Sequence, residues 1–178
     1  LPEPLPMPRA YAGTLSADGK RVAYEEVSTV MFPGWIESSG WRHYRGGRTH
    51  PISVMNLADH SVTKLPWTDS NDSYPEWIGN TVYFLSDRTF TTNLFSYNAD
   101  TKELKQLTRH DDFDIANATA GPDAVVYEQA GYIHLVDAKT GQSRQLNIEV
   151  TGDLPWARAG YKRVAGMIRS ASLSPAGV

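Results

Sequence analysis

Short apolar runs recur along this chain, and glycine, proline, asparagine and aspartate separate them. Three of these runs follow a turn signal and are similar to one another: RVAYEEV (21–27), TVYFLSD (81–87) and AVVYEQA (124–130). Stretches such as VYFL and VVY are continuously apolar, which is typical of strands that are buried on both faces. No window shows sustained helical periodicity, so the pattern predicts an all-β chain.

The strands belong to a repeated unit of four. Each of these first runs is followed by a second run and then by a shorter third run, which ends in leucine. The second runs are ISVMNLAD, NLFSYNAD and YIHLVDAK (52–59, 93–100 and 132–139), and the third runs are SVTKL, ELKQL and QSRQL (61–65, 103–107 and 142–146). SYPEWI (73–78) and IANATA (115–120) open the next units. Four short strands in about 40 to 45 residues match the repeat length of a β-propeller blade.

The number of units predicts an incomplete ring. A sheet that is apolar on both faces becomes buried when neighbouring sheets stack around an axis. The chain holds about three near-complete units, and its last residues, SLSPAGV (172–178), are similar to the LSADGKRV (15–22) that opens a unit. Closed propellers have about four to eight blades. We therefore expect an all-β, partial β-propeller of about three four-stranded blades with the starts of flanking units, taken from a longer polypeptide.

The loop between the second and third strands of the first unit is unusually long. It runs from residue 28 to residue 50, whereas the matching gap is TFTT (89–92) in the second unit and the single Gly131 in the third. This insertion contains the basic and aromatic stretch SGWRHYRGGRTHP (39–51). The planar guanidinium group of arginine binds a carboxylate with two parallel hydrogen bonds, and aromatic rings stack on the guanidinium group. The candidate residues for contact with a peptide or a neighbouring domain are Trp41, Arg42, Tyr44, Arg45 and Arg48.

The same residues also fit a purely architectural role. In that case Trp41 and Tyr44 hold the loop against its own propeller, while the guanidinium groups of Arg42, Arg45 and Arg48 point to water. We favour this second interpretation, because exposed loops of aromatic and basic residues usually serve the fold.

Composition removes several classes of function. The net charge is −3 and the pI is about 5.9, which argues against nucleic acid, because phosphate binding normally needs a basic face. Cysteine is absent from the sequence, so disulfides, cysteine-based zinc sites and thiol catalysis are excluded. No apolar run reaches the roughly 20 residues that span a bilayer. We expect no nucleic-acid partner, no membrane partner and no cofactor.

No catalytic or metal-binding set of residues stands out. A Gly-x-Ser-x-Gly motif is absent, and Ser16 and Ser174 lie in the turn-like stretches SADG and SPAG. HDDFD (110–114) gathers oxygen ligands that suit calcium, but its spacing is not that of an EF-hand, and a solvated loop is the favoured interpretation. His134 falls inside a strand run, where neither a serine nor a metal set supports a role as general base. We therefore predict no catalytic residue and no metal site.

Three stretches resemble the first propeller of the tricorn protease family: GWRHYRGGRTHPISVMNLA, SNDSYPEWIGNTVYFLSDR and TNLFSYNADTKELKQLTRHDDFD. The most specific feature is the Trp-x-x-Tyr-Arg-Gly-Gly segment, here Trp41 to Gly47, shortly before a strand like PISVMNL. A second feature is the strand that runs from Tyr83 to Arg88. The resemblance covers approximately residues 10–178, whereas TolB-like propellers share the general blade pattern alone.

This resemblance implies a large serine peptidase with two propellers and a PDZ-like domain between the parts of its catalytic core. Residues 1–155 are then later blades of the first propeller, residues 156–167 are a linker, and residues 168–178 start a second propeller or the next blade. The catalytic residues of the family lie downstream, so none maps onto this sequence. The implied function is non-catalytic, namely to channel or gate peptide substrates and products and to aid assembly.

The resemblance also implies partners and a compartment. The partners are peptides, downstream catalytic domains of the same chain and further copies in a homo-oligomer. A periplasmic or secreted location is favoured over the cytoplasm. Two alternatives stay open. One is a free-standing TolB-like propeller that binds a protein or peptide partner, and the other is a propeller enzyme that acts on sugars with carboxylates from other blades.

Overall fold

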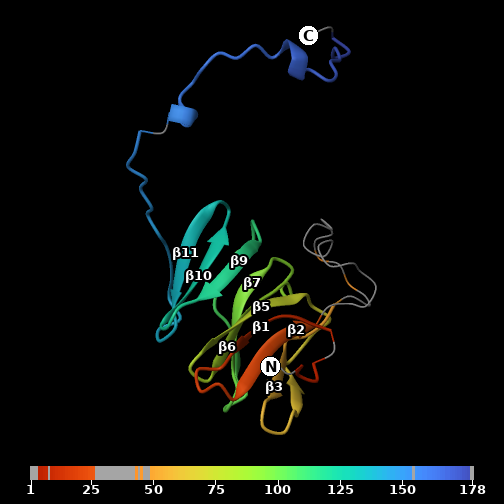
Figure 1. The fold of residues 1–178 in the computed structure, drawn as a ribbon, viewed down its shortest axis with the longest axis vertical. Coiled ribbons are helices and arrows are strands. Elements are labelled where there is room, and N and C mark those ends of the chain that lie inside the picture. Colours follow the sequence, from red (N-terminus) through yellow and green to blue (C-terminus); the bar gives the residue numbers. More distant parts are fainter. Residues whose placement is uncertain are drawn as a thin grey trace. The chain divides into compact units, whose positions relative to one another are not determined.

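The chain divides into two compact units, residues 1–147 and residues 148–178. The structure is a computed structural model, and it describes residues 4–7, 9–26, 43, 45, 49–153 and 155–176. Within those ranges every strand belongs to the first unit, which holds three four-stranded antiparallel sheets (Figure 1). The prediction of an all-β chain with about three four-stranded blades is confirmed.

Each sheet is a meander, in which consecutive strands pair in chain order. Blade 1 consists of β1 (Ala10–Leu15), β2 (Arg21–Glu26), β3 (Ser53–Asn56) and β4 (Val62–Lys64). Blade 2 consists of β5 (Asp72–Ile78), β6 (Thr81–Ser86), β7 (Asn93–Asn98) and β8 (Leu104–Gln106). Blade 3 consists of β9 (Ile115–Ala120), β10 (Ala124–Gln129), β11 (Tyr132–Asp137) and β12 (Ser143–Gln145).

The hairpins between the third and fourth strands of the blades share one turn device. In each blade the last residue of the third strand is Asn56, Asn98 or Asp137. Its side-chain oxygen accepts the backbone amide two residues further on, at 2.9 to 3.0 Å. Asparagine and aspartate favour such turns because the side chain replaces a backbone acceptor. The turn signals in the sequence therefore have a direct local cause.

The sequence pattern did not identify β1 as a strand. Its run AYAGTL contains Gly13, and its pairing with β2 is irregular between Ala10 and Gly13. Glycine and irregular pairing both weaken the pattern that marks a strand. The glycine is needed for a close approach, because a Cβ at this position would lie 2.6 Å from the carbonyl oxygen of Ala23 and 2.9 Å from the Cβ of Tyr24.

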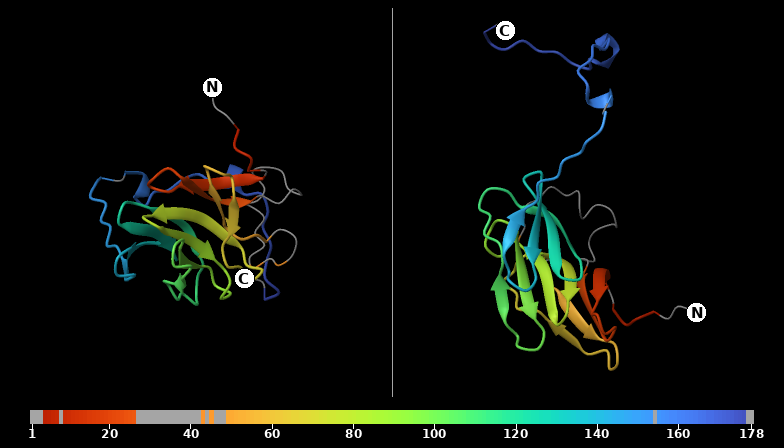
Figure 2. Two further views of the ribbon diagram at one scale, coloured as in Figure 1. Left: turned by 90° about the horizontal axis from the view of Figure 1, so that it is seen from below. Right: turned by 90° about the vertical axis from the view of Figure 1, so that its left-hand side faces the viewer.

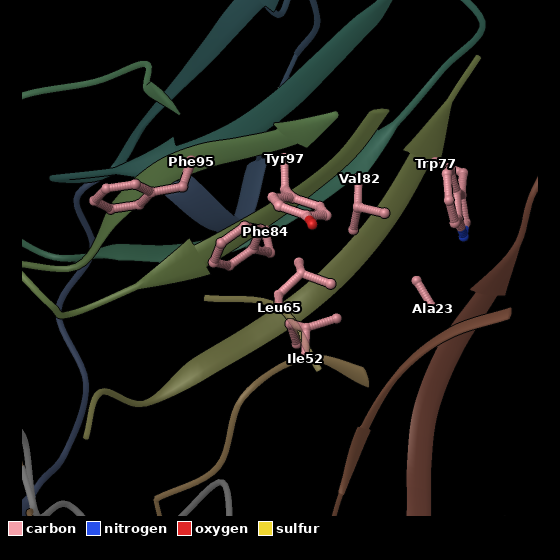
Figure 3. Close-up of a cluster of buried hydrophobic side chains, with 8 residues drawn as sticks. All are labelled: Ala23, Ile52, Leu65, Trp77, Val82, Phe84, Phe95 and Tyr97. Carbon is pink, nitrogen blue, oxygen red and sulfur yellow. The ribbon is translucent and has the colours of Figure 1, made fainter. Parts of the chain in front are cut away.

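Blade 2 is buried on both of its faces. Val82 and Phe84 of β6 belong to a core shared with blade 1, and the intervening Tyr83 and Leu85 belong to a core shared with blade 3. Successive side chains of a strand point to opposite faces, so one strand serves both cores. This explains the continuously apolar sequence TVYFL. Figure 3 shows the first of these cores, which comprises Ala23, Ile52, Leu65, Trp77, Val82, Phe84, Phe95 and Tyr97.

The three blades follow one another through contacts between their first strands. β1 contacts β5, and β5 contacts β9. The side chain of Thr14 in β1 donates a hydrogen bond to the carbonyl oxygen of Pro75 in β5 at 2.9 Å. Figure 2 shows the successive sheets stacked in this order. The burial of blade 3 is one-sided by comparison, since Val125 and Tyr127 of β10 are buried against blade 2 while Val126 between them is half-buried.

The second unit contains two short 3-10 helices, Pro155–Ala157 and Ala165–Met167, and its described side chains are exposed. Over the described part of the whole chain, no helix is long and apolar enough to cross a membrane. The expected linker at residues 156–167 and the expected new propeller or blade at residues 168–178 stay predictions, as does the end of the first propeller at residue 155.

Gly13→Ala is expected to destabilise the protein, because the added methyl group meets the backbone of β2 and must push the strands apart. The expected loss is roughly 1–3 kcal/mol of unfolding free energy, measured by urea denaturation. Gly121→Ala is the matched control, because a Cβ there has its nearest neighbour at 3.8 Å. The control should leave the midpoint unchanged or slightly higher. Equal midpoints for the two variants would contradict the close approach.

Candidate functional site

The two ends of the blades differ in how their strands are connected. At the end that we call the turn end, short hairpin turns join the first strand to the second and the third to the fourth. At the opposite end, which we call the insertion end, lie the loops between second and third strands and the connections between blades. The described segments of the insertion end are residues 43, 45, 49–52, 65–71, 87–92, 107–114 and 130–131.

Arg45 of the insertion binds the loop of blade 2 that follows β6. Its Nη1 donates to Oδ2 of Asp87 at 2.8 Å, and its Nη2 donates to the carbonyl oxygen of Asp87 at 3.1 Å. Part of this guanidinium therefore serves an internal carboxylate. The other four candidate residues lie outside the described residues: Trp41, Arg42, Tyr44 and Arg48. Contact of these five residues with a peptide or a domain stays a prediction.

Asp87 is buried and joins three segments of the insertion end. Its Oδ1 accepts the backbone amide of Asn71 at 2.8 Å, and its Oδ2 accepts the side-chain amide of Asn71 at 2.7 Å. Nδ1 of His43 lies 3.8 Å from the same Oδ2. The ring of His43 also stacks on Phe90, with centroids 4.1 Å apart. The described residues of the insertion thus pack on blade 2, the next blade along the chain.

A second buried carboxylate, Asp72, begins β5. It accepts hydrogen bonds from Oγ of Ser70 at 2.8 Å, from Oγ of Ser86 at 2.6 Å and from Nη2 of Arg88 at 2.9 Å. The guanidinium carbon of Arg88 lies within 5.2 Å of the centroids of two phenylalanine rings. Burial raises the pKa of Asp72, and Arg88 and the two hydroxyl groups oppose this rise. A buried ion pair with these partners is costly to break at either member.

The segment Ser86–Arg88 takes part in both the Asp72 network and the Asp87 network. The partners lie far apart along the chain, so the sequence pattern did not reveal either network. Ser86 and Arg88 reach Asp72, which lies 14 and 16 residues away. Asp87 between them reaches Arg45, which lies 42 residues away. The sequence marked these residues as part of a family-like strand, but no local signal indicated their partners.

The loop that contains HDDFD uses its carboxylates to hold backbone and side-chain amides. Asp112 accepts the amide of Phe113 at 2.7 Å and the side-chain amide of Gln129 at 2.9 Å. Asp114 accepts the amide of Thr92 at 2.8 Å. Across the described residues, no three histidine, cysteine, aspartate or glutamate side chains gather closely enough to hold a metal ion. The carboxylates of Asp112 and Asp114 thus accept hydrogen bonds from amides in and beside the loop. The absence of a metal site stays a prediction.

His110 joins blade 2 to blade 3. Its backbone amide donates to Oδ1 of Asn93 at 2.8 Å, and Nδ2 of Asn93 donates to its carbonyl oxygen at 3.0 Å. Its ring Nε2 lies 3.1 Å from the hydroxyl group of Tyr127, which is 2.7 Å from Oγ of Ser143. The ring of His134, inside β11 as expected, stacks on Tyr127 with centroids 5.0 Å apart. Burial, and then the nearby His134, lower the pKa of His110.

Ser16 belongs to the hairpin turn between β1 and β2. Its Oγ donates to Oδ1 of Asp18 at 2.6 Å and accepts the amide of Arg21 at 2.9 Å. The SADG stretch therefore forms a turn, as the sequence predicted, and the hydroxyl group of Ser16 serves that turn.

Asp87→Asn is expected to loosen the insertion end, because an amide cannot replace a carboxylate that accepts from both Arg45 and Asn71. The expected loss of unfolding free energy is about 1–3 kcal/mol, with faster hydrogen exchange at the amide of Asn71. Asp111→Asn is the matched control, since Asp111 is exposed in the neighbouring connection. Equal exchange rates in the two variants would rule out the role of Asp87.

His110 should make the protein less stable in mild acid. Its lowered pKa means that the folded state favours the neutral ring, so stability falls as the pH drops through the ordinary histidine value of about 6.5. Asp111 and Asp112 oppose this effect without reversing it. We expect His110→Gln to lose less unfolding free energy than the wild type between neutral and mildly acidic pH, measured by denaturation at each pH. His60→Gln, in an exposed turn, is the control for the loss of an imidazole elsewhere in the protein. An unchanged profile for His110→Gln would contradict this account.

Comparison with known proteins agrees with this architecture. The family model described as the tricorn protease N-terminal β-propeller domain matches residues 1–142. The tricorn protease homolog of Saccharolobus solfataricus is 28% identical over 124 residues, a match that covers 70% of this chain and 12% of that protein. The chain therefore spans a small part of the length of this curated relative.

Solved structures show the same fold. The crystal structure of the tricorn protease superposes with a TM-score of 0.59 at 22% identity, and the match covers 78% of this chain and 13% of that one. TolB from Acinetobacter baumannii superposes with a TM-score of 0.54 at 19% identity, over 76% of this chain and 31% of that one. Because the family model covers most of the chain, and its residues fold into stacked four-stranded blades, this protein belongs to the tricorn protease family through its N-terminal β-propeller domain.

Proposed function

We propose that this chain is a non-catalytic propeller segment of a tricorn-like serine peptidase, which channels or gates peptide substrates and products and aids assembly. The observation that carries the proposal is the match of the family's propeller domain to residues 1–142, which contain nearly all of the stacked sheets. The relative named above is about eight times longer than the matched part, so the peptidase activity itself belongs to the proposal.

The charged groups of the insertion end support a structural role for this segment. Asp72 is paired with Arg88, and Asp87 is paired with Arg45, so these carboxylates hold loops in place. A general base or nucleophile needs to reach a substrate and exchange a proton with it. The Arg45–Asp87 pair instead joins the insertion to blade 2, and the Arg88–Asp72 pair joins the start of β5 to the segment after β6 within blade 2.

The partners follow from this role. They are peptides in transit, catalytic domains of a longer chain and further copies in a homo-oligomer, and an exported location is favoured over the cytoplasm. The insertion residues Trp41, Arg42, Tyr44, Arg45 and Arg48 are proposed to contact a peptide or one of those domains.

A free-standing TolB-like propeller that binds a protein or peptide partner is the second candidate, and the likeness to TolB favours it as far as the fold is concerned. The sequence of the natural gene beyond residue 178 separates the two. A second propeller, a PDZ-like domain and a serine-bearing core support the peptidase, whereas an end after one or two more blades supports the free-standing propeller.

The purified 178-residue chain is expected to hydrolyse no fluorogenic peptide, whereas the full-length gene product should hydrolyse such peptides. The physical reason is that Ser16 is engaged in a turn, and that His110 and His134 pack against Tyr127. Release of the fluorophore, followed over time, is the measurement. Reproducible cleavage by the chain alone, after contaminating peptidases are removed, would contradict the non-catalytic role; an inactive full-length protein would contradict the peptidase assignment.

A further inference from the structure

Exposed aromatic rings gather at the insertion end of the blades. Four of them stand there on separate segments, with exposed fractions of 40% for Trp67, 70% for Phe90, 58% for Phe113 and 56% for Tyr132. Trp67, Phe90 and Phe113 lie in three successive loops, and Tyr132 is the first residue of β11. Among the described residues of the first unit, the turn end has no exposed aromatic side chain. The two ends of the blades are therefore chemically different.

Hydrogen bonds place three of these rings on adjoining segments. The amide of Thr92, two residues after Phe90, donates to the carboxylate of the residue that follows Phe113, at 2.8 Å. The side-chain amide of Gln129 donates to the carbonyl oxygen of Phe113 at 3.2 Å, and Gln129 pairs with Tyr132 in the sheet. The three rings thus follow one another from blade 2 to blade 3.

The loops that carry the rings are held by the fold. Nε1 of Trp67 donates to the carbonyl oxygen of Ser70 at 2.8 Å. The loop of Phe90 is fixed by Asp87 at its start, and one face of the Phe90 ring stacks on His43. Exposed rings on fixed loops lose little conformational freedom when a ligand binds, which favours affinity.

The setting of the rings favours an extended ligand over a folded domain. Along the chain, Phe90 lies between two threonines and Phe113 between two aspartates. The exposed charged residues of these loops are Asp69, Arg109, Asp111 and Asp112. A folded domain suits a continuous apolar patch with a polar rim. Separate rings in a polar setting instead suit a chain in extended conformation, which places individual apolar side chains against individual rings. Large aromatic residues are the usual anchors of such contacts.

We propose that the insertion end binds extended peptides that carry apolar side chains, and that Trp67, Phe90, Phe113 and Tyr132 are the anchoring rings. This inference rests on the proposed function in one respect, namely that peptides pass this propeller. It adds which end of the blades they contact and which class of side chain is recognised there.

The test measures peptide binding to the 178-residue chain by fluorescence anisotropy. The probe is a short fluorescein-labelled peptide in which phenylalanine and leucine alternate with serine, and the control peptide has serine at every position. The wild type should bind the probe and not the control. The triple variant Phe90→Ser, Phe113→Ser and Tyr132→Ser should bind the probe at least about tenfold more weakly.

The matched control variant, Leu15→Ser with Val62→Ser, removes exposed apolar side chains from the turn end and should bind like the wild type. All the substituted side chains are exposed, so the melting temperatures of both variants should stay close to that of the wild type. If the triple variant melts early, the single variant Phe90→Ser carries the test with a smaller but measurable loss of affinity.

If the triple variant and the single variant Phe90→Ser bind the probe peptide as tightly as the wild type does, this inference is overturned and the proposed function still stands. Failure of the wild type to bind the probe would also overturn it. The proposed function is checked independently by peptide turnover of the full-length protein, so the two failures are distinguishable.

Discussion

The burial of blade 2 on both faces is the constraint on which the rest of the first unit depends. Val82 and Phe84 need blade 1, and Tyr83 and Leu85 need blade 3, because each side chain would otherwise meet water. Fully burying a large apolar side chain stabilises a protein by about 1.5–3 kcal/mol. One sheet of this kind therefore has no stable existence alone, and the neighbours on its two sides are part of its fold.

Polar networks then fix the loops of the stacked blades, and the two ends use different devices. At the turn end, residues such as Asn98 and Asp137 accept amides within their own hairpins. At the insertion end, Asp87 joins segments from different blades, and Asn93 holds His110 across the connection between blades 2 and 3. The hairpins of the turn end are thus held locally, and Arg21 adds a hydrogen bond to Asn80 of the next blade at 2.9 Å. The loop contacts of the insertion end described above depend on the stacking of the blades.

This difference has a consequence for function. A loop that is held by contacts from several blades presents its side chains at fixed positions, which suits recognition. Phe90 is an example, since Asp87 fixes the start of its loop and His43 covers one face of its ring. The propeller domain of this tricorn family member is in this sense a scaffold, on which stacking supplies stability and the insertion end supplies a surface.

The sequence by itself determined the turns, the repeat and every strand of the blades except β1, because each of these depends on near neighbours along the chain. It missed β1, since Gly13 is explained by the approach of β2 and not by any pattern within AYAGTL. It also gave Ser86 to Arg88 no role, and it left the partners of Arg45 open. Those roles depend on residues that lie 14 to 42 positions away, and only the stacking of the blades brings the partners together. Local pattern is set by which faces of a strand avoid water, whereas the choice of a partner across a blade is decided by tertiary structure.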